Sequence, residues 1–169
     1  GNYFIKIKDV ITSNNNWKKE HLNFILNNYR KAKNFKLLIS WVEEIYDKVT
    51  SKYLTDINEY FIREINDRLG IKVEIRRSSE FVLEEGKTER LLNICTDLGI
   101  DKYYSGPAAK AYIDEGLFNS KNVLVEYLDY SLFESYNQLC SGFEHVVSVL
   151  DLMLNVPLND WVNLLNIGK

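Results

Sequence analysis

The spacing of hydrophobic residues changes near Gly70, and this change constrains the fold more than any other feature of the sequence. Before Gly70, apolar side chains recur at helical intervals, which predicts helices over residues 17–33, 35–49 and 53–69. After it, short segments alternate apolar and polar residues, which predicts strands over residues 71–76, 102–105 and 123–128. Because helical patterns lie between these strands, the region is typical of right-handed crossovers and a parallel sheet.

Turn-forming residues and the remaining patterns complete the predicted order of elements. Gly70 stands where a left-handed helix terminus is expected, Gly99 ends a predicted helix over residues 87–98, and Pro107 takes the favoured first position of another. The remaining segments are predicted as a strand over residues 3–8 and helices over residues 143–154 and 158–165. We therefore expect one α/β domain over residues 1–169, with a short, mainly parallel sheet flanked by helices and a helical N-terminal segment.

The net charge of −3 is unevenly distributed along the chain. Residues 1–36 hold eight lysines and arginines against two acids, whereas residues 91–169 hold four basic and ten acidic residues. A basic end suits an anionic small molecule, a phosphorylated carrier or an acidic membrane surface, with a solvated helix face as the structural alternative. A nucleic-acid-binding domain is usually basic overall, which disfavours that class. With no transmembrane segment and no signal peptide in the sequence, we expect a cytoplasmic protein.

Cysteine and histidine usage gives no indication of a metal or redox site. Cys95 and Cys140 stand in apolar contexts without a CxxC or histidine-spaced partner, so we expect two reduced core thiols. His21 and His145 are the only histidines and form no HxxxH pattern, which makes a zinc site unexpected. GxGxxG and GxSxG are absent, so the sequence predicts no cofactor and disfavours dehydrogenase and hydrolase functions.

Gly86-Lys87-Thr88 is similar to the end of a phosphate-binding loop but lacks the rest of that motif. The motif needs a glycine five residues before Gly86, where Phe81 stands, so a nucleoside triphosphatase is disfavoured. We expect Thr88 or a neighbour to cap the helix that begins there. Lys87 and Arg90 fall on the first turn of that helix and can face an anionic ligand.

Ser105-Gly106-Pro107 joins the end of a predicted strand to the start of a predicted helix. Open α/β sheets place their ligands at such strand ends, and a helix N-terminus attracts a carboxylate or phosphate. Gly106 lets the backbone approach a ligand closely, and Ser105 offers a hydroxyl group. An ordinary helix start is the structural alternative.

His21 lies one helical turn after Trp17, so both side chains leave the same face of the predicted basic helix. Lys18 lies near that face, and its charge would favour the neutral form of the imidazole. His21 is therefore a candidate for proton transfer near neutral pH, with a packed core histidine as the alternative. Asp129, after a predicted strand, and Asp151, on a predicted helix, are candidate acids or bases that the sequence alone cannot bring together.

Ordered motifs along the chain add a resemblance to these local patterns. They are Trp17-Lys18-Lys19-x-His21, Asn28-Tyr29, Glu85 to Leu91, Tyr104 to Pro107 with Lys110 and Tyr112, Val125 to Tyr130, and Ser148 to Leu152. Together they resemble the WbqC-like family of bacterial proteins over residues 10–155. Genes of that family lie in surface-polysaccharide clusters, including those for O-antigen, and glycyl or aminoacyl transfer onto a sugar has been suggested for members.

The sequence departs from this family at its start. Members usually open with a His-Gln-Pro-x-Tyr/Phe motif on a first strand, followed by a longer segment before the Trp-Lys-Lys-x-His helix. Nothing of that kind precedes Tyr3, so we expect either a piece of a longer protein or a member without that part. If the sequence is a piece of a longer protein, we expect that a catalytic histidine can lie outside it.

The resemblance implies group transfer to an amino sugar or nucleotide-linked sugar during synthesis of O-antigen or another surface polysaccharide. We expect an anionic small-molecule or sugar substrate. The residues expected to bind it are Trp17, Lys18, Lys87, Thr88, Arg90, Ser105, Gly106 and Lys110. His21 would transfer a proton, and Asp129 or Asp151 would orient a hydroxyl or amine. The alternatives are a non-catalytic module that binds a glycan or nucleotide sugar, and a helical adaptor that uses the basic first helix.

Overall fold

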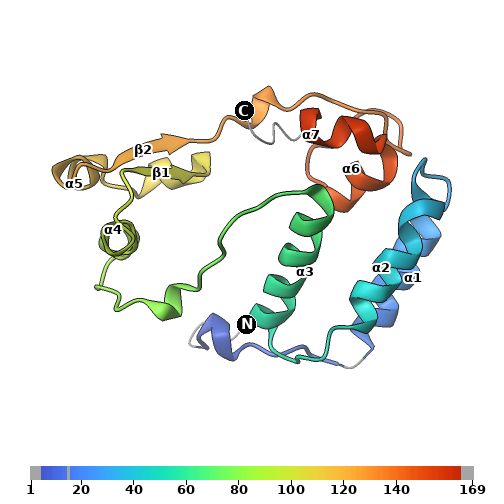
Figure 1. Ribbon diagram of the computed structural model, residues 1–169, viewed down its shortest axis with the longest axis horizontal. Coiled ribbons are helices and arrows are strands. Elements are labelled where there is room, and N and C mark those ends of the chain that lie inside the picture. Colours follow the sequence, from blue (N-terminus) through green and yellow to red (C-terminus); the bar gives the residue numbers. More distant parts are fainter. Residues whose placement is uncertain (1–4, 15, 165–169) are drawn as a thin grey trace. The chain divides into compact units, whose positions relative to one another are not determined.

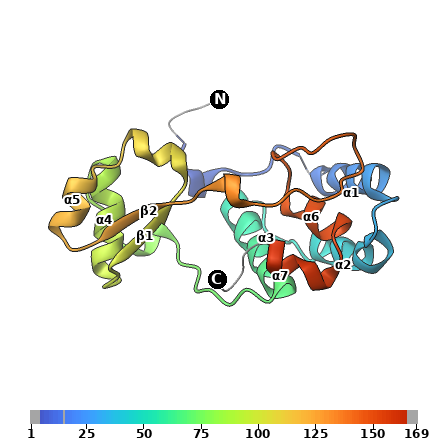
Figure 2. The same cartoon turned by 90° about the horizontal axis from the view of Figure 1, so that it is seen from above.

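A computed structural model describes residues 5–14 and 16–164 of the chain (Figure 1). The chain divides into two compact units. The first is discontinuous and joins Gly1–Lys72 to Glu134–Lys169, and the second is Val73–Phe133. Within the first unit, the C-terminal helices lie beside the N-terminal ones (Figure 2). That residues 1–169 act as one domain stays a prediction.

The first unit is helical. Its α-helices are α1 (Trp17–Tyr29), α2 (Phe35–Asp47), α3 (Leu54–Leu69), α6 (Val149–Asn155) and α7 (Trp161–Leu164). The helices predicted before Gly70 are confirmed, although α1 ends at Tyr29 rather than at Lys33. Gly70 ends α3 with a left-handed φ of 73°, as expected for a residue without a Cβ. Among the described residues, no helix combines the length and apolar character needed to cross a membrane.

Asn34 fixes the connection between α1 and α2 to the end of α6. Its backbone N–H donates to the Leu154 carbonyl at 2.8 Å, and its buried side-chain amide donates to the carbonyls of Met153, at 2.8 Å, and Val156. These bonds satisfy polar groups that would be costly to bury unpaired. They also hold the connection in a non-helical path, which explains why α1 stops before Lys33.

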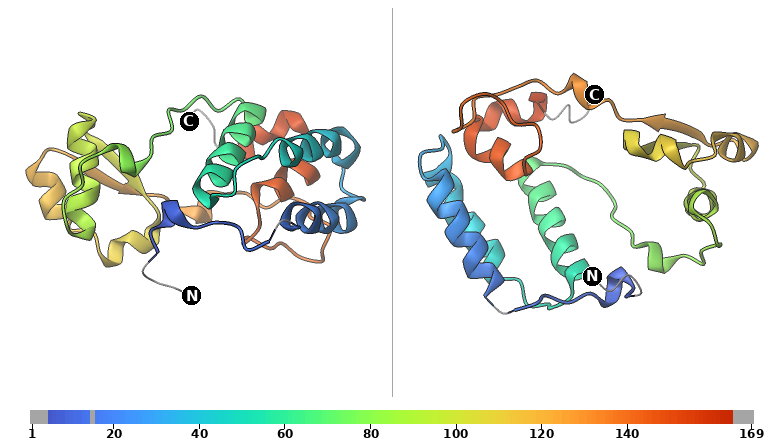
Figure 3. Two further views of the ribbon diagram at one scale, coloured as in Figure 1. Left: turned by 90° about the horizontal axis from the view of Figure 1, so that it is seen from below. Right: turned by 180° about the vertical axis from the view of Figure 1, so that it is seen from behind.

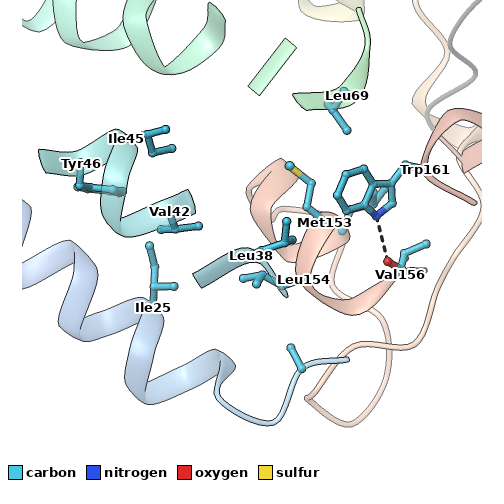
Figure 4. Close-up of a cluster of buried hydrophobic side chains, with 12 residues drawn as sticks. Ile25, Leu38, Val42, Ile45, Tyr46, Leu69, Met153, Leu154, Val156 and Trp161 are labelled. Atoms are coloured by element: carbon cyan, nitrogen blue, oxygen red, sulfur yellow. Dashed lines mark hydrogen bonds between the residues drawn. The ribbon is translucent and has the colours of Figure 1, made fainter. Parts of the chain in front are cut away.

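The core of the first unit lies between α2 and α6 (Figure 4). Leu38, Val42, Met153 and Leu154 are all fully buried there. Burial of each such side chain contributes about 1.5–3 kcal/mol before the entropy cost of folding. The Trp161 indole donates to the Val156 carbonyl at 2.9 Å, which attaches α7 to the end of α6.

The second unit carries the sheet (Figure 3). Its elements include α4 (Lys87–Asp97), β1 (Lys102–Ser105), the 3-10 helix η3 (Pro107–Ala111), α5 (Glu115–Ser120) and β2 (Leu124–Tyr127). β1 and β2 pair in parallel, with Lys102 opposite Leu124 and Ser105 opposite Tyr127. Helices α4 and α5 pack around a core that includes Phe118. The predicted short parallel sheet flanked by helices is thus confirmed for these two strands.

Two predicted strands are wrong where the structure describes them. Residues 71–76 form an extended connection rather than a sheet strand, and Val73 is exposed. Of the predicted strand over residues 3–8, the first two residues lie outside the described part, and the 3-10 helix η1 (Ile7–Asp9) occupies its end. Period-two alternation also suits an extended segment in which only some of the apolar side chains, here Ile71 and Ile75, are half-buried. A strand additionally needs a neighbouring backbone with which to pair.

The predicted C-terminal helices are shorter than expected. The helix predicted over residues 143–154 begins only at Val149, because Ser148 caps it: its Oγ accepts from the Leu150 N–H at 3.3 Å. The helix predicted over residues 158–165 divides into the 3-10 helix η5 (Leu158–Asp160) and α7, and residue 165 lies outside the described part. Cys95 is buried as predicted, whereas Cys140 is exposed, so its prediction as a core thiol is wrong.

Candidate functional site

Asp151 is a buried carboxylate in the first turn of α6. Asp151 is only 6% exposed, and its neighbours in the helix are the apolar residues Leu150 and Leu152. The first turn of a helix favours a negative charge, but a charge removed from water also needs hydrogen-bond partners. Asp151 is therefore the residue from which the site is built.

Four neutral side chains supply hydrogen bonds to this carboxylate. Oδ1 accepts from the Tyr29 hydroxyl at 3.0 Å and from the Asn155 amide at 3.2 Å. Oδ2 accepts from the Tyr136 hydroxyl at 2.8 Å and from the Gln138 amide at 3.0 Å. A carboxylate offers about four acceptor positions, and all four are used here. We call these five residues the Asp151 cluster.

The loop after Gln138 holds two members of the cluster in place. The Gln138 amide accepts from the Glu144 N–H at 2.7 Å and donates to the Glu144 carbonyl at 2.9 Å. The backbone of a neighbouring strand would form the same pair of hydrogen bonds. Gly142, with a φ of 83°, makes the return of the loop possible. Tyr136 packs edge-on against Phe143, with ring centroids 5.0 Å apart. The donors of Tyr136 and Gln138 are thus positioned by the same loop.

Both tyrosines of the cluster are held in the protonated form. Burial raises the pKa of Tyr29 to about 12, and the hydrogen bond and negative charge of Asp151 act in the same direction. Burial and the hydrogen bond to Asp151 also raise the pKa of Tyr136. Each phenol donates its single hydroxyl hydrogen to the carboxylate. Its oxygen can therefore offer only lone pairs to a ligand.

Two cavities border residues 136–138. The first, which we call the neutral cavity, has a volume of about 460 Å³ and is lined by hydroxyl, amide and aromatic groups, including Ser135, Tyr136 and Phe143. The second, which we call the basic cavity, has a volume of about 480 Å³ and includes Lys31, Lys33, Asn155 and Asp160 in its lining. Tyr136, Asn137 and Gln138 line both cavities. Each volume falls in the range of small-molecule sites.

Comparison with protein families decides the membership that the ordered motifs suggested. The model of the WbqC-like protein family matches residues 2–162. The chain belongs to this family. It is also similar to the uncharacterized protein Rv1507c of Mycobacterium tuberculosis, with 35% identity over 156 residues that cover 92% of this chain and 68% of the relative. No solved structure matches.

The predicted site residues on α1 of this WbqC-like protein lie against α2. The His21 ring is exposed and meets Trp17 edge-on at 5.4 Å between centroids, so their shared face is confirmed. His21 Nδ1 lies 3.5 Å from the Tyr46 hydroxyl. Lys18 donates to the carbonyls of Val49 and, at 3.5 Å, Asp47, and so closes the C-terminal end of α2. Within the described residues, the side-chain donors to Asp151 come from its cluster and not from His21.

Thr88 has a structural position in the second unit. It is buried, its hydroxyl donates to the Tyr112 carbonyl at 3.1 Å, and it accepts from the Asp114 N–H at 3.1 Å. The cap position of α4 is taken by Gly86, so Thr88 does not cap the helix. Its hydroxyl instead joins the start of α4 to the loop between η3 and α5.

Lys87 and Arg90 line a third cavity, of about 550 Å³, together with Tyr112. The Lys87 ammonium lies 5.5 Å from the centroid of the Tyr112 ring, within cation–π range. Both cations are exposed on the first turn of α4, as the sequence predicted. This arrangement can hold an anionic group, and whether it does so stays a prediction.

The ends of β1 and β2 meet at one edge of the sheet, because the strands are parallel. A Cβ on Gly106 would lie 3.4 Å from the Tyr130 hydroxyl, which shows how closely the two segments approach. Ser105, half-buried, accepts through its carbonyl from the Leu128 N–H at 2.9 Å. Pro107 begins the five-residue 3-10 helix η3 rather than an α-helix. A short 3-10 helix has a smaller dipole than an α-helix. The positive end at this turn would therefore attract an anion less strongly than predicted.

Asp129 lies at the same edge and is bonded locally through one carboxylate oxygen, Oδ1. Its carboxylate accepts from the Ser131 hydroxyl at 2.7 Å and from the Ser131 N–H at 2.9 Å. These hydrogen bonds lower the pKa of Asp129, with a smaller contribution in the same direction from the positive charge of Lys110. The Lys110 ammonium lies 5.0 Å from the centroid of the Tyr127 ring. Both predicted residues belong to the second unit, whereas Asp151 belongs to the first.

Sequence reasoning identified Asp151 but missed most of its partners. The sequence draws attention to Tyr29 only through the Asn28-Tyr29 motif. Asn155 follows Asp151 by one helical turn, which was the one local signal available. Tyr136 and Gln138 lie in an irregular segment that shows no periodicity. Over the described residues, no group of three histidine, cysteine, aspartate or glutamate side chains could hold a metal ion.

Proposed function

We propose that this WbqC-like protein acts in bacterial surface-polysaccharide synthesis, transferring a glycyl or similar acyl group to an amino sugar or nucleotide-linked sugar. The Asp151 cluster forms the site for the acceptor sugar. The resemblance of the chain supports the pathway, and the chemistry of the cluster supports the kind of acceptor.

The observation that carries this proposal is the hydrogen bond from Tyr136 to Asp151 at the wall of two cavities. Since Tyr136 gives its hydrogen to the carboxylate, it can only accept from a ligand. A sugar amine or hydroxyl is such a donor. Phe143 adds an aromatic surface, and Ser135 and Asn137 add polar groups to the neutral cavity.

The same hydrogen bond provides a path for a proton during transfer. The acceptor amine attacks the carbonyl carbon of an activated acyl donor such as a thioester, and the carbon–nitrogen bond forms as the carbon–sulfur bond breaks. The sulfur leaves with the bonding electron pair. The amine proton passes to the Tyr136 oxygen while the Tyr136 proton passes to Asp151, and the relay then runs in reverse, from Asp151 through the Tyr136 hydroxyl to the departing thiolate. General-base assistance of this kind contributes about 10²–10⁴ in rate.

A transfer assay with glucosamine and a glycyl thioester tests the proposal, with glycyl-glucosamine detected by mass spectrometry. We expect Asp151→Asn and Tyr136→Phe to lower the rate at least ~10²-fold. Asp67→Asn, at an exposed position of α3, serves as the matched control and should keep the full rate. His21→Gln measures the rival proton acceptor. A selective rate loss in His21→Gln, with Tyr136→Phe active, would move the chemistry away from the cluster.

A non-catalytic module that binds glycans is the second candidate. The observation that favours it is the complete use of the Asp151 acceptor positions, which leaves the carboxylate without a free lone-pair site. On this alternative the protein binds glucosamine without turnover, and Tyr136→Phe weakens binding alone. The adaptor hypothesis predicts neither sugar binding nor turnover.

A further inference from the structure

We infer that the substrate is a sugar phosphoester and that the basic cavity takes its phosphate group while the neutral cavity takes its sugar. This inference rests on the proposed function and narrows its substrate class. It starts from the shared wall: Tyr136, Asn137 and Gln138 line both cavities, so a single extended ligand can contact both.

The two cavities differ in charge. The neutral cavity is lined by Ser135, Tyr136, Asn137, Gln138, Cys140, Gly142 and Phe143, which carry no formal charge at neutral pH. Among the described residues of its lining, the basic cavity carries the ammonium groups of Lys31 and Lys33 against the carboxylate of Asp160. The lining of the basic cavity therefore has a net positive charge, whereas hydroxyl and amide groups suit an uncharged polyol.

The two lysines are available to a ligand. Over residues 5–14 and 16–164, Lys31 and Lys33 form no ion pair, and both side chains are exposed. An unpaired ammonium retains its three donors for a phosphate oxygen. The buried charge of Asp151 is already compensated by its four donors. Among the described residues that line this cavity, Asp160 is therefore the one competing carboxylate.

The backbone that carries the lysines is fixed rather than free. Asn34, directly after Lys33, is buried and bonded to the carbonyls of Met153, Leu154 and Val156. The end of α6 also supplies Asn155 to the same cavity. The attachment of the connection to α6 therefore sets the lysines beside the Asp151 cluster before any ligand binds, which lowers the ordering cost of binding.

Calorimetric titration of the full chain with glucosamine, glucosamine 1-phosphate and inorganic phosphate tests the inference. We expect glucosamine 1-phosphate to bind at least ~10-fold more tightly than glucosamine, with an advantage that shrinks in high salt. Inorganic phosphate should compete with glucosamine 1-phosphate. The double variant K31Q/K33Q should bring the two sugar affinities within about twofold, whereas Lys36→Gln, an exposed lysine outside the cavity, should preserve the difference.

Equal affinities in the wild-type protein, or a phosphate preference that survives K31Q/K33Q, would overturn the inference. Either result leaves the transfer assay with unphosphorylated glucosamine to judge the proposed function. Conversely, a lysine-dependent phosphate preference combined with absent transfer supports the inference and moves the function to the binding-module candidate. The two failures are thus distinguishable.

Discussion

The Tyr136 hydroxyl lies 2.8 Å from Oδ2 of Asp151, although Tyr136 comes from an irregular loop and Asp151 from a helix fifteen residues later. The same carboxylate bonds Tyr29, which is 122 residues away in sequence. A single buried charge therefore joins three separate segments of the first unit. Loss of that charge should affect both the fold and the site.

Asp151→Asn should lower the free energy of unfolding by about 2–4 kcal/mol. The new amide nitrogen is a donor among four donors, so at least one buried hydrogen bond is lost without replacement. Urea denaturation followed by circular dichroism measures the change. Asp67→Asn is the control and should stay within ~0.5 kcal/mol of wild type. A comparable small loss in Asp151→Asn would contradict the structural role of the carboxylate.

Stability should fall at alkaline pH as Tyr29 ionises. The folded-state pKa of Tyr29, about 12, exceeds the ordinary tyrosine value of 10.0, so the folded state holds this proton more tightly than the unfolded state does. The resulting stability is fully present below pH 10 and is lost as the pH rises toward 12. Urea midpoints measured across this window should fall less steeply in Tyr29→Phe than in wild type. Identical slopes would mean that Tyr29 titrates normally.

Thr88→Val should destabilise the second unit by about 1–3 kcal/mol, since it leaves the Tyr112 carbonyl and the Asp114 N–H without their buried partner. Thr88→Ser keeps the hydroxyl and should recover most of that loss. Thermal unfolding of the two variants provides the comparison. If Thr88 instead only bound a ligand, both variants would unfold at the same temperature as the wild-type protein.

Lys18→Met should cost about 0.5–1 kcal/mol of stability, because the ammonium no longer serves the carbonyls at the end of α2. Lys19→Met removes an exposed charge from the same helix and should be nearly neutral. Urea midpoints of the pair isolate the contribution of the hydrogen bonds. Equal midpoints would mean that the hydrogen bonds of Lys18 contribute no stability, and Lys18 would then be available to bind substrate.

Gly86→Ala should destabilise the protein by about 1–2 kcal/mol, since its φ of 110° strains any L-residue, whereas the exposed Glu89 side chain nearest to the added Cβ can move aside. Gly106→Ala is the matched comparison. Its φ of −70° is ordinary, and the added Cβ would lie 3.4 Å from the Tyr130 hydroxyl. Gly106→Ala should fold normally. A loss of anion binding in this variant would therefore show that the Ser105-Gly106-Pro107 turn contacts the anion.

Local signals predicted the elements that depend on local chemistry. The period of α2 and α3, the left-handed Gly70 and the short strands around Pro107 all follow from residues close in sequence. Residues 71–76 show the limit, because alternation fixes an extended shape but cannot supply a strand partner.

The candidate site was only partly predictable for a related reason. Asp151 could be identified as a candidate acid, but its neighbours Tyr29 and Tyr136 reach it through tertiary packing across 122 and 15 residues. The Gln138 side-chain amide bonds the N–H and carbonyl of Glu144 as a strand backbone would. No pattern of residues in the sequence predicts such a contact. The sequence thus predicted the type of group but not its surroundings.

The discontinuity of the first unit has a consequence for biosynthesis. Helices α1 to α3 leave the ribosome before α6, whose Met153 and Leu154 cover Leu38 and Val42 in the finished core. At bacterial and eukaryotic elongation rates, synthesis of the intervening second unit takes roughly 3–12 seconds. For that interval the part of the α2 apolar face that packs against α6 has no native cover, although α1 and α3 have already been made. We therefore expect slowed translation within residues 73–133 to lower the yield of folded protein, and added holding chaperone to restore it.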